Sequence, residues 1–233
     1  MKKLFKMSAV ILFVLIVFSA CGRNKSVSGK ITSFPPYGER VVTAIGDSIA
    51  AGYGLDSQED NYLTLFSDNI GAVLNNDAVS GYDSGEVLKS LSDEKTAADI
   101  KNADAIVVSV GGNDFFHRKD IMIDALKNAL LHGEGFFPEE VTNIYDEYEK
   151  NLSRIIDEIK NMNPDAYIIV QTVYNPFLKQ TLNFSYINVG KTANRYVTRL
   201  NDSIKNVCKT KNRVFVFDVA PEMNEDAENF YGT

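Results

Sequence analysis

The feature that most constrains the fold of this sequence is the stretch from Val41 to Gly54, VVTAIGDSIAAGYG. Its first five residues are β-branched or small and apolar, and they run directly into a Gly-Asp-Ser turn. Such a run, bounded by turn residues, predicts a strand that is buried on both faces of a sheet. We therefore expect Ser48 just beyond the carboxyl end of a strand, where open α/β sheets bind their ligands.

Two further apolar runs also end in polar loops that contain glycine. Residues 76–81 (NDAVSG) predict a short second strand that ends at Gly81. Residues 105–114 (AIVVSVGGND) predict a third strand that leads to Asn113. Runs at 166–173 and 213–218 predict the fourth and fifth strands. Because helical segments separate the strands, the sequence predicts an α/β fold whose parallel sheet is covered by helices on both faces.

Helices are expected where apolar residues recur at intervals of three and four. The strongest example is the segment 138–162, whose opposite face is charged. The other expected helices cover residues 61–74, 84–91, 120–131 and 191–205, and residues 97–101 are expected to form a turn.

A serine hydroxyl becomes a useful nucleophile only with a base to accept its proton and donors to hold the developing oxyanion. Taken alone, the Gly-Asp-Ser turn is more typical of a helix cap than of a catalytic serine. A turn glycine at Gly81 and a loop Asn at Asn113 are likewise common. The functional interpretation therefore depends on finding these residues together, in this order, at strand ends.

In chain order, GDS at 46–48, Gly81 and GGND at 111–114 resemble the first three signature blocks of the SGNH, or GDSL, hydrolase family. The resemblance implies a three-layer α/β/α, flavodoxin-like fold with about five parallel strands. It also implies that Ser48 is the nucleophile, and that the backbone N–H groups of Ser48 and Gly81 and the side chain of Asn113 form the oxyanion hole. It implies no cofactor and no metal.

The fourth signature of the family, an Asp-x-x-His block that supplies the base and its orienting acid, is not found in the sequence. The two histidines are His117 and His132. We therefore expect the hydrolase domain, residues 39–233, to be C-terminally incomplete and a very poor esterase as written. His117 is a weak candidate for a replacement base because it follows Asn113 by four residues. Asp218 ends the fifth expected strand and does not match the catalytic aspartate of the family.

The N-terminal residues 1–20 predict a signal peptide, because three lysines precede an apolar run at 7–18 that is too short to span a bilayer. The segment FSACG at 18–22 resembles a bacterial lipobox, which implies lipidation of Cys21; an ordinary signal with an incidental cysteine is the alternative. Residues 21–38 predict a flexible tether. We expect an extracytoplasmic protein that is lipid-anchored to the bacterial cell membrane.

Charge and cysteine content limit the possible partners. A net charge of −7 argues against nucleic-acid binding and against electrostatic attraction to anionic lipids. With Cys21 lipidated, Cys208 has no partner for a disulfide, and we expect it to be a buried structural thiol.

The sequence thus predicts a serine-dependent hydrolase of acyl esters whose substrate is a lipid, an acetylated carbohydrate or a thioester. The alternatives are a non-catalytic binding lipoprotein with the same fold and an inactive truncated fragment. A Rossmann-like nucleotide binder is less well supported, because residues 46–54 lack the G-x-G-x-x-G spacing. In the loop after the fourth strand, Asn175 and Phe177 either contact substrate or only form a turn.

Overall fold

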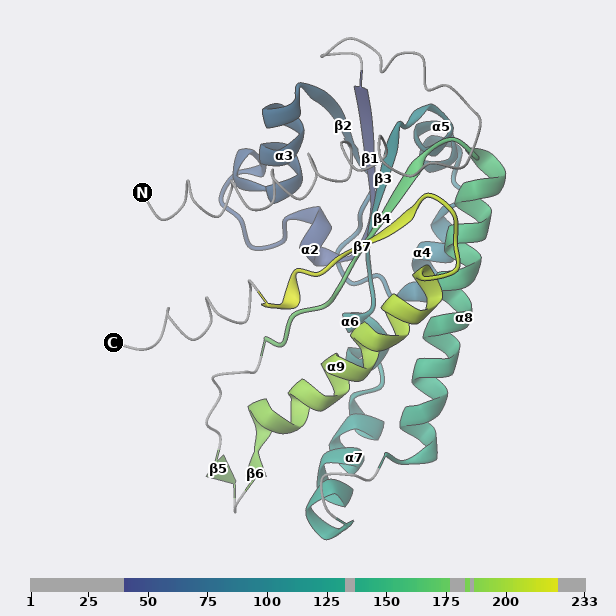
Figure 1. Cartoon of the computed structure of the whole chain (residues 1–233). Helices are drawn as coiled ribbons and strands as arrows, with labels where there is room; N and C mark the ends of the chain where they lie inside the picture. Colours follow the sequence, from purple (N-terminus) through teal and green to yellow (C-terminus); the bar gives the residue numbers. More distant parts are fainter. Residues whose placement is uncertain (1–39, 133–136, 177–182, 185–186, 222–233) are drawn as a thin grey trace.

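The computed structural model describes residues 40–132, 137–176, 183–184 and 187–221. A five-stranded parallel sheet with the strand order β2-β1-β3-β4-β7 lies at its centre (Figure 1). This confirms the α/β fold and the expected number of parallel strands. Two short strands, β5 and β6, pair separately and antiparallel. The strands are β1 (Arg40–Gly46), β2 (Ala72–Asn76), β3 (Ala105–Ser109), β4 (Tyr167–Gln171), β5 (Asn183–Phe184), β6 (Ile187–Asn188) and β7 (Val214–Phe217).

Strand β1 has β2 on one side and β3 on the other, with Val42 opposite both Leu74 and Ala105. The chain therefore leaves β1 toward one edge of the sheet and later returns to build the other edge. A crevice forms at such a reversal of strand order, outside the carboxyl ends of the two strands. The topology thus places the turn after β1 and the turn after β3 next to each other.

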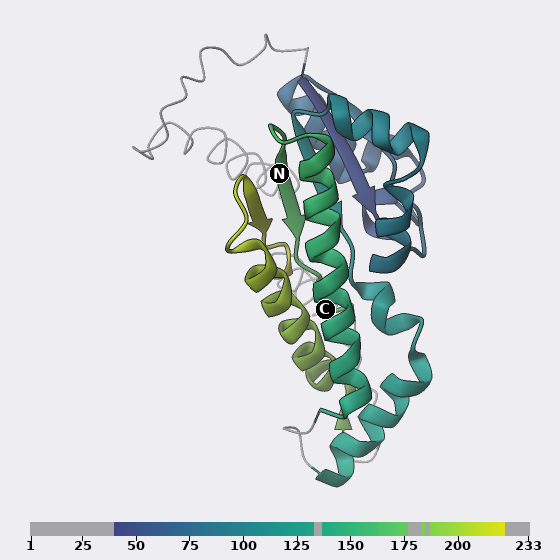
Figure 2. The same ribbon diagram turned by 90° about the vertical axis from the view of Figure 1, so that its right-hand side faces the viewer.

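Helices cover both faces of the sheet and complete three layers (Figure 2). Alternate residues of β3 serve the two faces: Ile106 and Val108 pack in one core, and Val107 packs in the other. The first face carries α4 (Ser84–Ser90), α5 (Glu94–Asn102), α8 (Glu139–Met162) and α9 (Val189–Cys208), and the second carries α2 (Ser48–Ala51) and α3 (Tyr62–Ile70).

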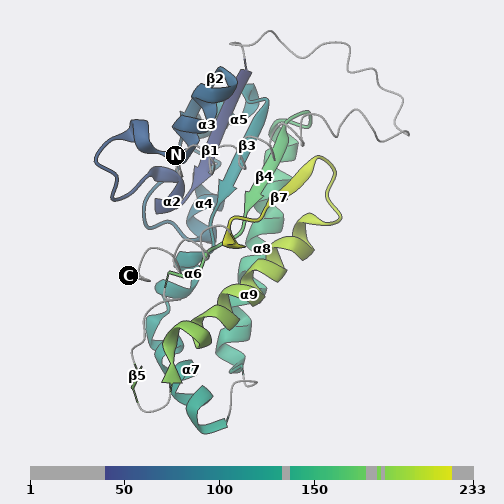
Figure 3. The same cartoon turned by 60° about the vertical axis from the view of Figure 1, so that its left-hand side comes forward.

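Two helices extend the molecule beyond the carboxyl edge of the sheet (Figures 1 and 3). They are α6 (Gly112–Phe116) and α7 (Lys119–His132), and a single turn of 3₁₀ helix, η1 (Gln58–Asp60), precedes α3. Helix α7 contacts α8. The helices expected at 84–91, 120–131, 138–162 and 191–205 are confirmed as α4, α7, α8 and α9.

The segment between β1 and α4 differs from the prediction. Helix α3 ends at Ile70 because Gly71 adopts a left-handed conformation, with φ of 62°, and its N–H bonds back to the helix. Residues 72–76 then form β2, so the expected helix at 61–74 was too long. The strand expected at 76–81 was wrong, because only Asn76 belongs to a strand. The expected turn at 97–101 lies inside helix α5.

Cys208, the last residue of α9, is buried with 2% of its surface exposed, as expected. No helix within the described ranges is long and apolar enough to cross a membrane. The expected signal peptide at 1–20, the expected tether at 21–38 with Cys21, and Phe177 all lie outside the described residues.

Candidate active site

Ser48 is the first residue of the short helix α2, and Asp47 alone separates it from the buried end of β1 at Gly46. The preceding Asp47 caps this helix: its Oδ1 accepts a hydrogen bond of 3.0 Å from the N–H of Ile49. The N–H of Asp47 donates to the carbonyl of Ser109 at the end of β3, over 2.9 Å. The turn is thus held at both ends, and Ser48 lies at the carboxyl edge of the sheet as expected.

Asn113 belongs to helix α6, which begins directly after the turn that follows β3. Its Nδ2 donates a hydrogen bond of 2.9 Å to the carbonyl of Tyr82. Because an amide nitrogen carries two hydrogens, this bond orients the group and leaves the second hydrogen for another acceptor. The structure brings Asn113 and Ser48 together, since both line the same pocket.

Gly81 lies in an exposed turn, five residues after the end of β2 rather than at a strand end. Its φ of 94° is a conformation that favours glycine, and no atom lies within 4 Å of the place where a Cβ would be. It is not among the residues that line the pocket. Its link to the site is indirect, because the neighbouring Tyr82 carbonyl accepts the Asn113 hydrogen bond.

The pocket next to Ser48 has a volume of about 310 Å³ and is walled mainly by apolar side chains. These come from the turns after β1, β3 and β4, from α6 and from the end of β7. The main apolar contributors are Ile49, Val110, Phe116, Val173, Tyr174 and Phe217. A cavity of this kind with a few polar groups is typical of small-molecule sites.

Polar groups also line this pocket, at the ends of β1, β3 and β4. Buried Gln171 accepts a hydrogen bond of 2.7 Å from the Tyr62 hydroxyl. Asp47 and Ser109 also line the pocket. Burial raises the pKa of the Asp47 carboxyl to about 6, against the opposing effect of the Ile49 N–H bond.

Asp114, next to Asn113, points into the protein interior with 3% of its surface exposed. Its carboxylate accepts two hydrogen bonds from Ser84: 3.1 Å from the N–H and 2.5 Å from the hydroxyl. Burial raises the pKa of this carboxyl to about 6, although both hydrogen bonds act in the opposite direction. The sequence analysis gave Asp114 no role of its own.

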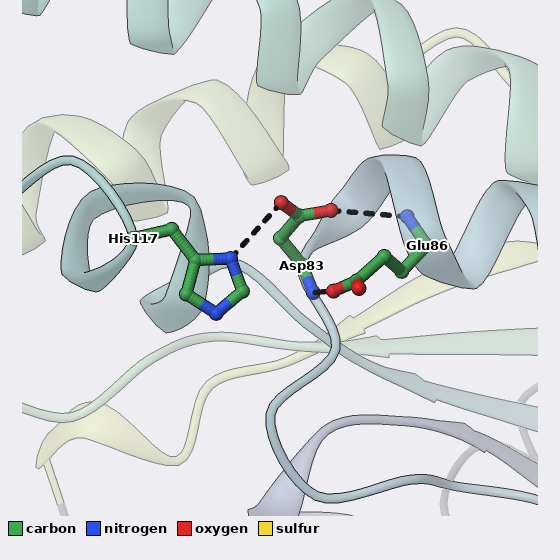
Figure 4. Close-up of side chains that lie close together, drawn as sticks. All are labelled: Asp83, Glu86 and His117. Carbon is green, nitrogen blue, oxygen red and sulfur yellow. Dashed lines mark hydrogen bonds and ion pairs between the residues drawn. The ribbon is translucent and has the colours of Figure 1, made fainter.

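His117 lies at the end of α6, with its Nδ1 3.2 Å from the Oδ2 of Asp83 (Figure 4). Asp83 and Glu86 also form a capping box at the start of α4, each carboxylate accepting from the backbone N–H of the other. Within the described residues, these three side chains form the one group of potential metal ligands with atoms within 4.8 Å of one another. The hydrogen bonds of Asp83 and Glu86 to the backbone account for this cluster as the N-terminal cap of α4.

The remaining candidates have structural partners. Asn175 is buried and its Nδ2 donates to the carbonyl of Gly190 over 2.9 Å, which ties the loop after β4 to α9. Asp218 accepts a 2.8 Å bond from Thr172 and pairs with Lys205 at 2.7 Å. The cation and these hydrogen bonds hold the pKa of Asp218 below its ordinary value, in spite of partial burial. His132 ends α7.

Tyr62, Gln171, Asp83 and Asp114 were missed as parts of the site or its surroundings. Their partners are distant in the sequence: Tyr62 and Gln171 are 109 positions apart, and Ser84 and Asp114 are 30 apart. Of these four residues, only Asp114 lies in a recognisable motif, the GGND block. That motif did not indicate that Asp114 would bond to Ser84.

Comparison with known proteins agrees with this geometry. The model of the GDSL-like lipase/acylhydrolase family matches residues 44–233. An uncharacterised protein of Bacillus subtilis, YpmR, is 31% identical over 155 residues, which are 64% of this chain and 55% of that protein. The spore germination lipase LipC of Bacillus licheniformis is 28% identical over 142 residues, or 58% of this chain and 64% of LipC. The matches thus span less than two thirds of either relative.

Solved structures share the fold at low sequence identity. The lipase Lip_vut3 from a goat rumen metagenome superposes with a TM-score of 0.60 at 19% identity, covering 78% of this chain and 81% of that structure. Phospholipase A1 of Streptomyces albidoflavus gives a TM-score of 0.58 at 16% identity, with 78% and 80% covered. The three-layer arrangement is therefore the flavodoxin-like fold of SGNH hydrolases, and this chain belongs to the GDSL-like lipase/acylhydrolase family.

Proposed function

We propose that this protein hydrolyses acyl esters, with Ser48 as the nucleophile. The observation that carries the proposal is that Ser48 and Asn113 line one apolar-walled pocket at the carboxyl edge of the sheet. An acyl chain would occupy the apolar part of this pocket, and the ester carbonyl would lie between Ser48 and Asn113. A lipid, an acetylated carbohydrate or a thioester would each present such a carbonyl.

In this mechanism the Ser48 oxygen attacks the carbonyl carbon and loses its proton to a general base. The carbonyl oxygen becomes an oxyanion, which receives hydrogen bonds from the free hydrogen of Asn113 Nδ2 and from the N–H groups of Ser48 and Gly81. The tetrahedral intermediate then collapses: the bond to the leaving alkoxide or thiolate breaks, the protonated base gives its proton to that group, and the acyl group stays on Ser48. Water then hydrolyses this acyl-enzyme by the same steps.

The general base is assigned to none of the described residues. The described part of the pocket wall contains no histidine, and its buried carboxylate, Asp47, is engaged in capping α2. The proposal therefore places the base outside the described residues. For the same reason we keep a second candidate function, in which the pocket binds an acyl group without hydrolysing it.

The test is hydrolysis of p-nitrophenyl acetate and butyrate by the chain and by its Ser48→Ala variant. A Ser92→Ala variant is the matched control, because Ser92 bonds only locally, to the Lys89 carbonyl, in an exposed turn. Turnover that Ser48→Ala abolishes and Ser92→Ala retains supports the hydrolase. Equal rates in all three folded proteins overturn hydrolysis by this chain, which is then a binding protein or an inactive fragment of a hydrolase.

We further propose that the protein is extracytoplasmic and anchored to the bacterial cell membrane through a lipid on Cys21. The lipobox-like sequence at 18–22 and the preceding apolar run support this anchor. In bacterial cells fed an alkyne-labelled fatty acid, we expect the unmodified chain to become labelled. A Cys21→Ser variant should remain unlabelled, and a Cys208→Ala variant, the control, should be labelled like the unmodified chain. Label that persists in Cys21→Ser would contradict the anchor.

A further inference from the structure

A buried hydrogen-bond network joins the two loops to which the proposed function assigns oxyanion donors. Its centre is Ser84, which has no exposed surface. The Ser84 hydroxyl donates to Asp114 Oδ1 over 2.5 Å and accepts from Asn151 Nδ2 over 3.0 Å. The Ser84 N–H donates to Asp114 Oδ2. The network therefore connects α4, α6 and α8.

The network ends close to both proposed donors. Asp114 follows Asn113 directly, and Ser84 follows Gly81 by three residues. A second bond crosses the same gap, because Asn113 Nδ2 donates to the Tyr82 carbonyl. Together with the contact between Asp83 and His117 at the end of α6, these bonds hold the segment from Gly81 to Ser84 against α6.

Gly81 itself has no side chain to hold it in place. It is exposed, and the space where its Cβ would lie is open, so its own packing does not fix the direction of its N–H. The position of this N–H therefore depends on the residues on either side. Before Gly81, the N–H of Val79 donates to the Gly46 carbonyl, and the Val79 carbonyl accepts from the N–H of Tyr82. After Gly81, the backbone is fixed through Ser84.

Helix α8 supports both loops from one face. Tyr148 and Asn151 are three residues apart and so lie side by side on the helix. The Tyr148 hydroxyl donates to the carbonyl of Val110, just after β3, while Asn151 donates to Ser84. One rigid helix of 24 residues thus contacts the Asn113 loop and the Gly81 loop.

We infer that Asp114, Ser84 and Asn151 are positioning residues that set the placement of the Gly81 N–H relative to the Asn113 amide. This inference rests on the proposed function for its effect on catalysis. Burying the Asp114 carboxylate has a desolvation cost that offsets much of the free energy gained from its hydrogen bonds. The network therefore contributes more to a fixed geometry than to the stability of the fold. These residues do not touch the substrate; they act through the two donors.

The test compares Ser84→Ala with Ser203→Ala in the complete chain. Ser203 offers a matched control, because it is also buried and its hydroxyl donates to a carboxylate, that of Glu149, over 2.6 Å. Ser203 lies in α9 and does not line the pocket. Both variants lose one serine–carboxylate hydrogen bond, but only one of these bonds lies in the network. Asn151→Ala, which leaves the Ser84–Asp114 bonds intact, is the milder second variant.

Two readouts are needed. In Ser84→Ala we expect a fall in kcat of about 10- to 100-fold for p-nitrophenyl butyrate, because donors that are misplaced by about 1 Å lose transition-state stabilisation. The KM should change less than about threefold, since the substitution leaves the contacts that bind the substrate in its ground state unchanged. Amide hydrogen exchange in residues 79–86, followed by mass spectrometry, should become faster. In Ser203→Ala, kcat and exchange in residues 79–86 should stay as in the unmodified chain.

The exchange readout separates this inference from the proposed function. If the chain shows no Ser48-dependent turnover, the proposed function fails, and exchange in residues 79–86 decides the inference alone. Unchanged exchange in both Ser84→Ala and Asn151→Ala overturns it. Faster exchange with an unchanged kcat in an active chain also overturns it, because the loop would then be ordered by the network without affecting the oxyanion hole.

Discussion

The Nδ1 of His117 lies 3.2 Å from the Oδ2 of Asp83, a carboxylate that also caps helix α4. Asp83 is the orienting partner that the sequence did not reveal for this histidine. The pair nevertheless lies beside the pocket rather than in it, since Phe116 lines the pocket and His117 does not. Their arrangement is that of a surface contact between α6 and α4.

We therefore expect His117→Ala to leave Ser48-dependent turnover within about threefold of the unmodified chain, a change that corresponds to less than about 1 kcal/mol in the activation free energy. The free energy of unfolding should fall by less than about 1 kcal/mol, as for other exposed ion pairs. Steady-state kinetics and urea denaturation of the variant check both values. A loss of turnover as large as that in Ser48→Ala would instead identify His117 as the base.

Asn113→Ala should lower kcat by about 10²- to 10³-fold with little change in KM, since it removes a donor used mainly in the transition state. Asn102→Ala is the control, because Asn102 is exposed on α5 and bonds only to the Ala98 carbonyl within its own helix. Kinetics with p-nitrophenyl butyrate distinguish the two variants. Equal activity in both would exclude Asn113 from the oxyanion hole.

The sequence allowed some elements to be predicted because their signals are local. Strand β1 is a run of β-branched and small residues, and α8 combines a buried stripe with a charged face. Strand β2 was missed because Val73 and Leu74 continue the helical spacing of the preceding segment. Only the left-handed conformation of Gly71, which the spacing does not encode, separates α3 from β2.

The same limit applies to the site. Ser48 and Asn113 could be found because each lies in a short motif at a strand end. The Ser84–Asp114 bonds could not, since they depend on how α4 and α6 meet in space. Gly81 was predicted from its motif, but β2 ends five residues earlier, and Gly81 is not among the residues that line the pocket.

Gly46 is expected to tolerate no side chain. Its φ is 146°, and a Cβ at this position would overlap the carbonyl of Ser109. Gly46→Ala should lower the free energy of unfolding by more than about 3 kcal/mol and displace the turn that carries Ser48. Gly54→Ala is the matched control: its φ is also positive, at 85°, but the space around it is open. It should cost only about 1 kcal/mol. Similar denaturation midpoints for the two variants would contradict the prediction.

Asp47→Asn should stabilise the protein at neutral pH. Burial raises the folded-state pKa of Asp47 to about 6, against 3.8 for the solvent-exposed group in an unfolded chain. Between these values the folded protein binds the proton more tightly, so its stability falls as pH rises from about 4 to 6 and stays lower above. A neutral Asn avoids this cost, and its side-chain oxygen can still accept from the Ile49 N–H.

The gain in the free energy of unfolding should be about 1–3 kcal/mol at pH 7 and should disappear below pH 4. Urea denaturation at pH 4 and pH 7 measures it, with Asp120→Asn, an exposed carboxylate on α7, as the control. A gain of equal size at both pH values would show that the titration of Asp47 is not its source.

Phe116→Ala should change the preference for acyl chain length. Phe116 lines the pocket while 53% of its surface is exposed, which places it at the mouth. A longer acyl chain would contact this ring and an acetyl group would not, and each buried methylene contributes about 0.8 kcal/mol. We expect kcat/KM to fall about two- to fivefold for p-nitrophenyl butyrate and to stay nearly constant for the acetate.

Ile123→Ala is the control, since Ile123 is exposed to a similar degree, 48%, but lies on α7 and does not line the pocket. An equal loss for both esters in Phe116→Ala would mean that the ring supports the site as a whole and does not contact the acyl chain.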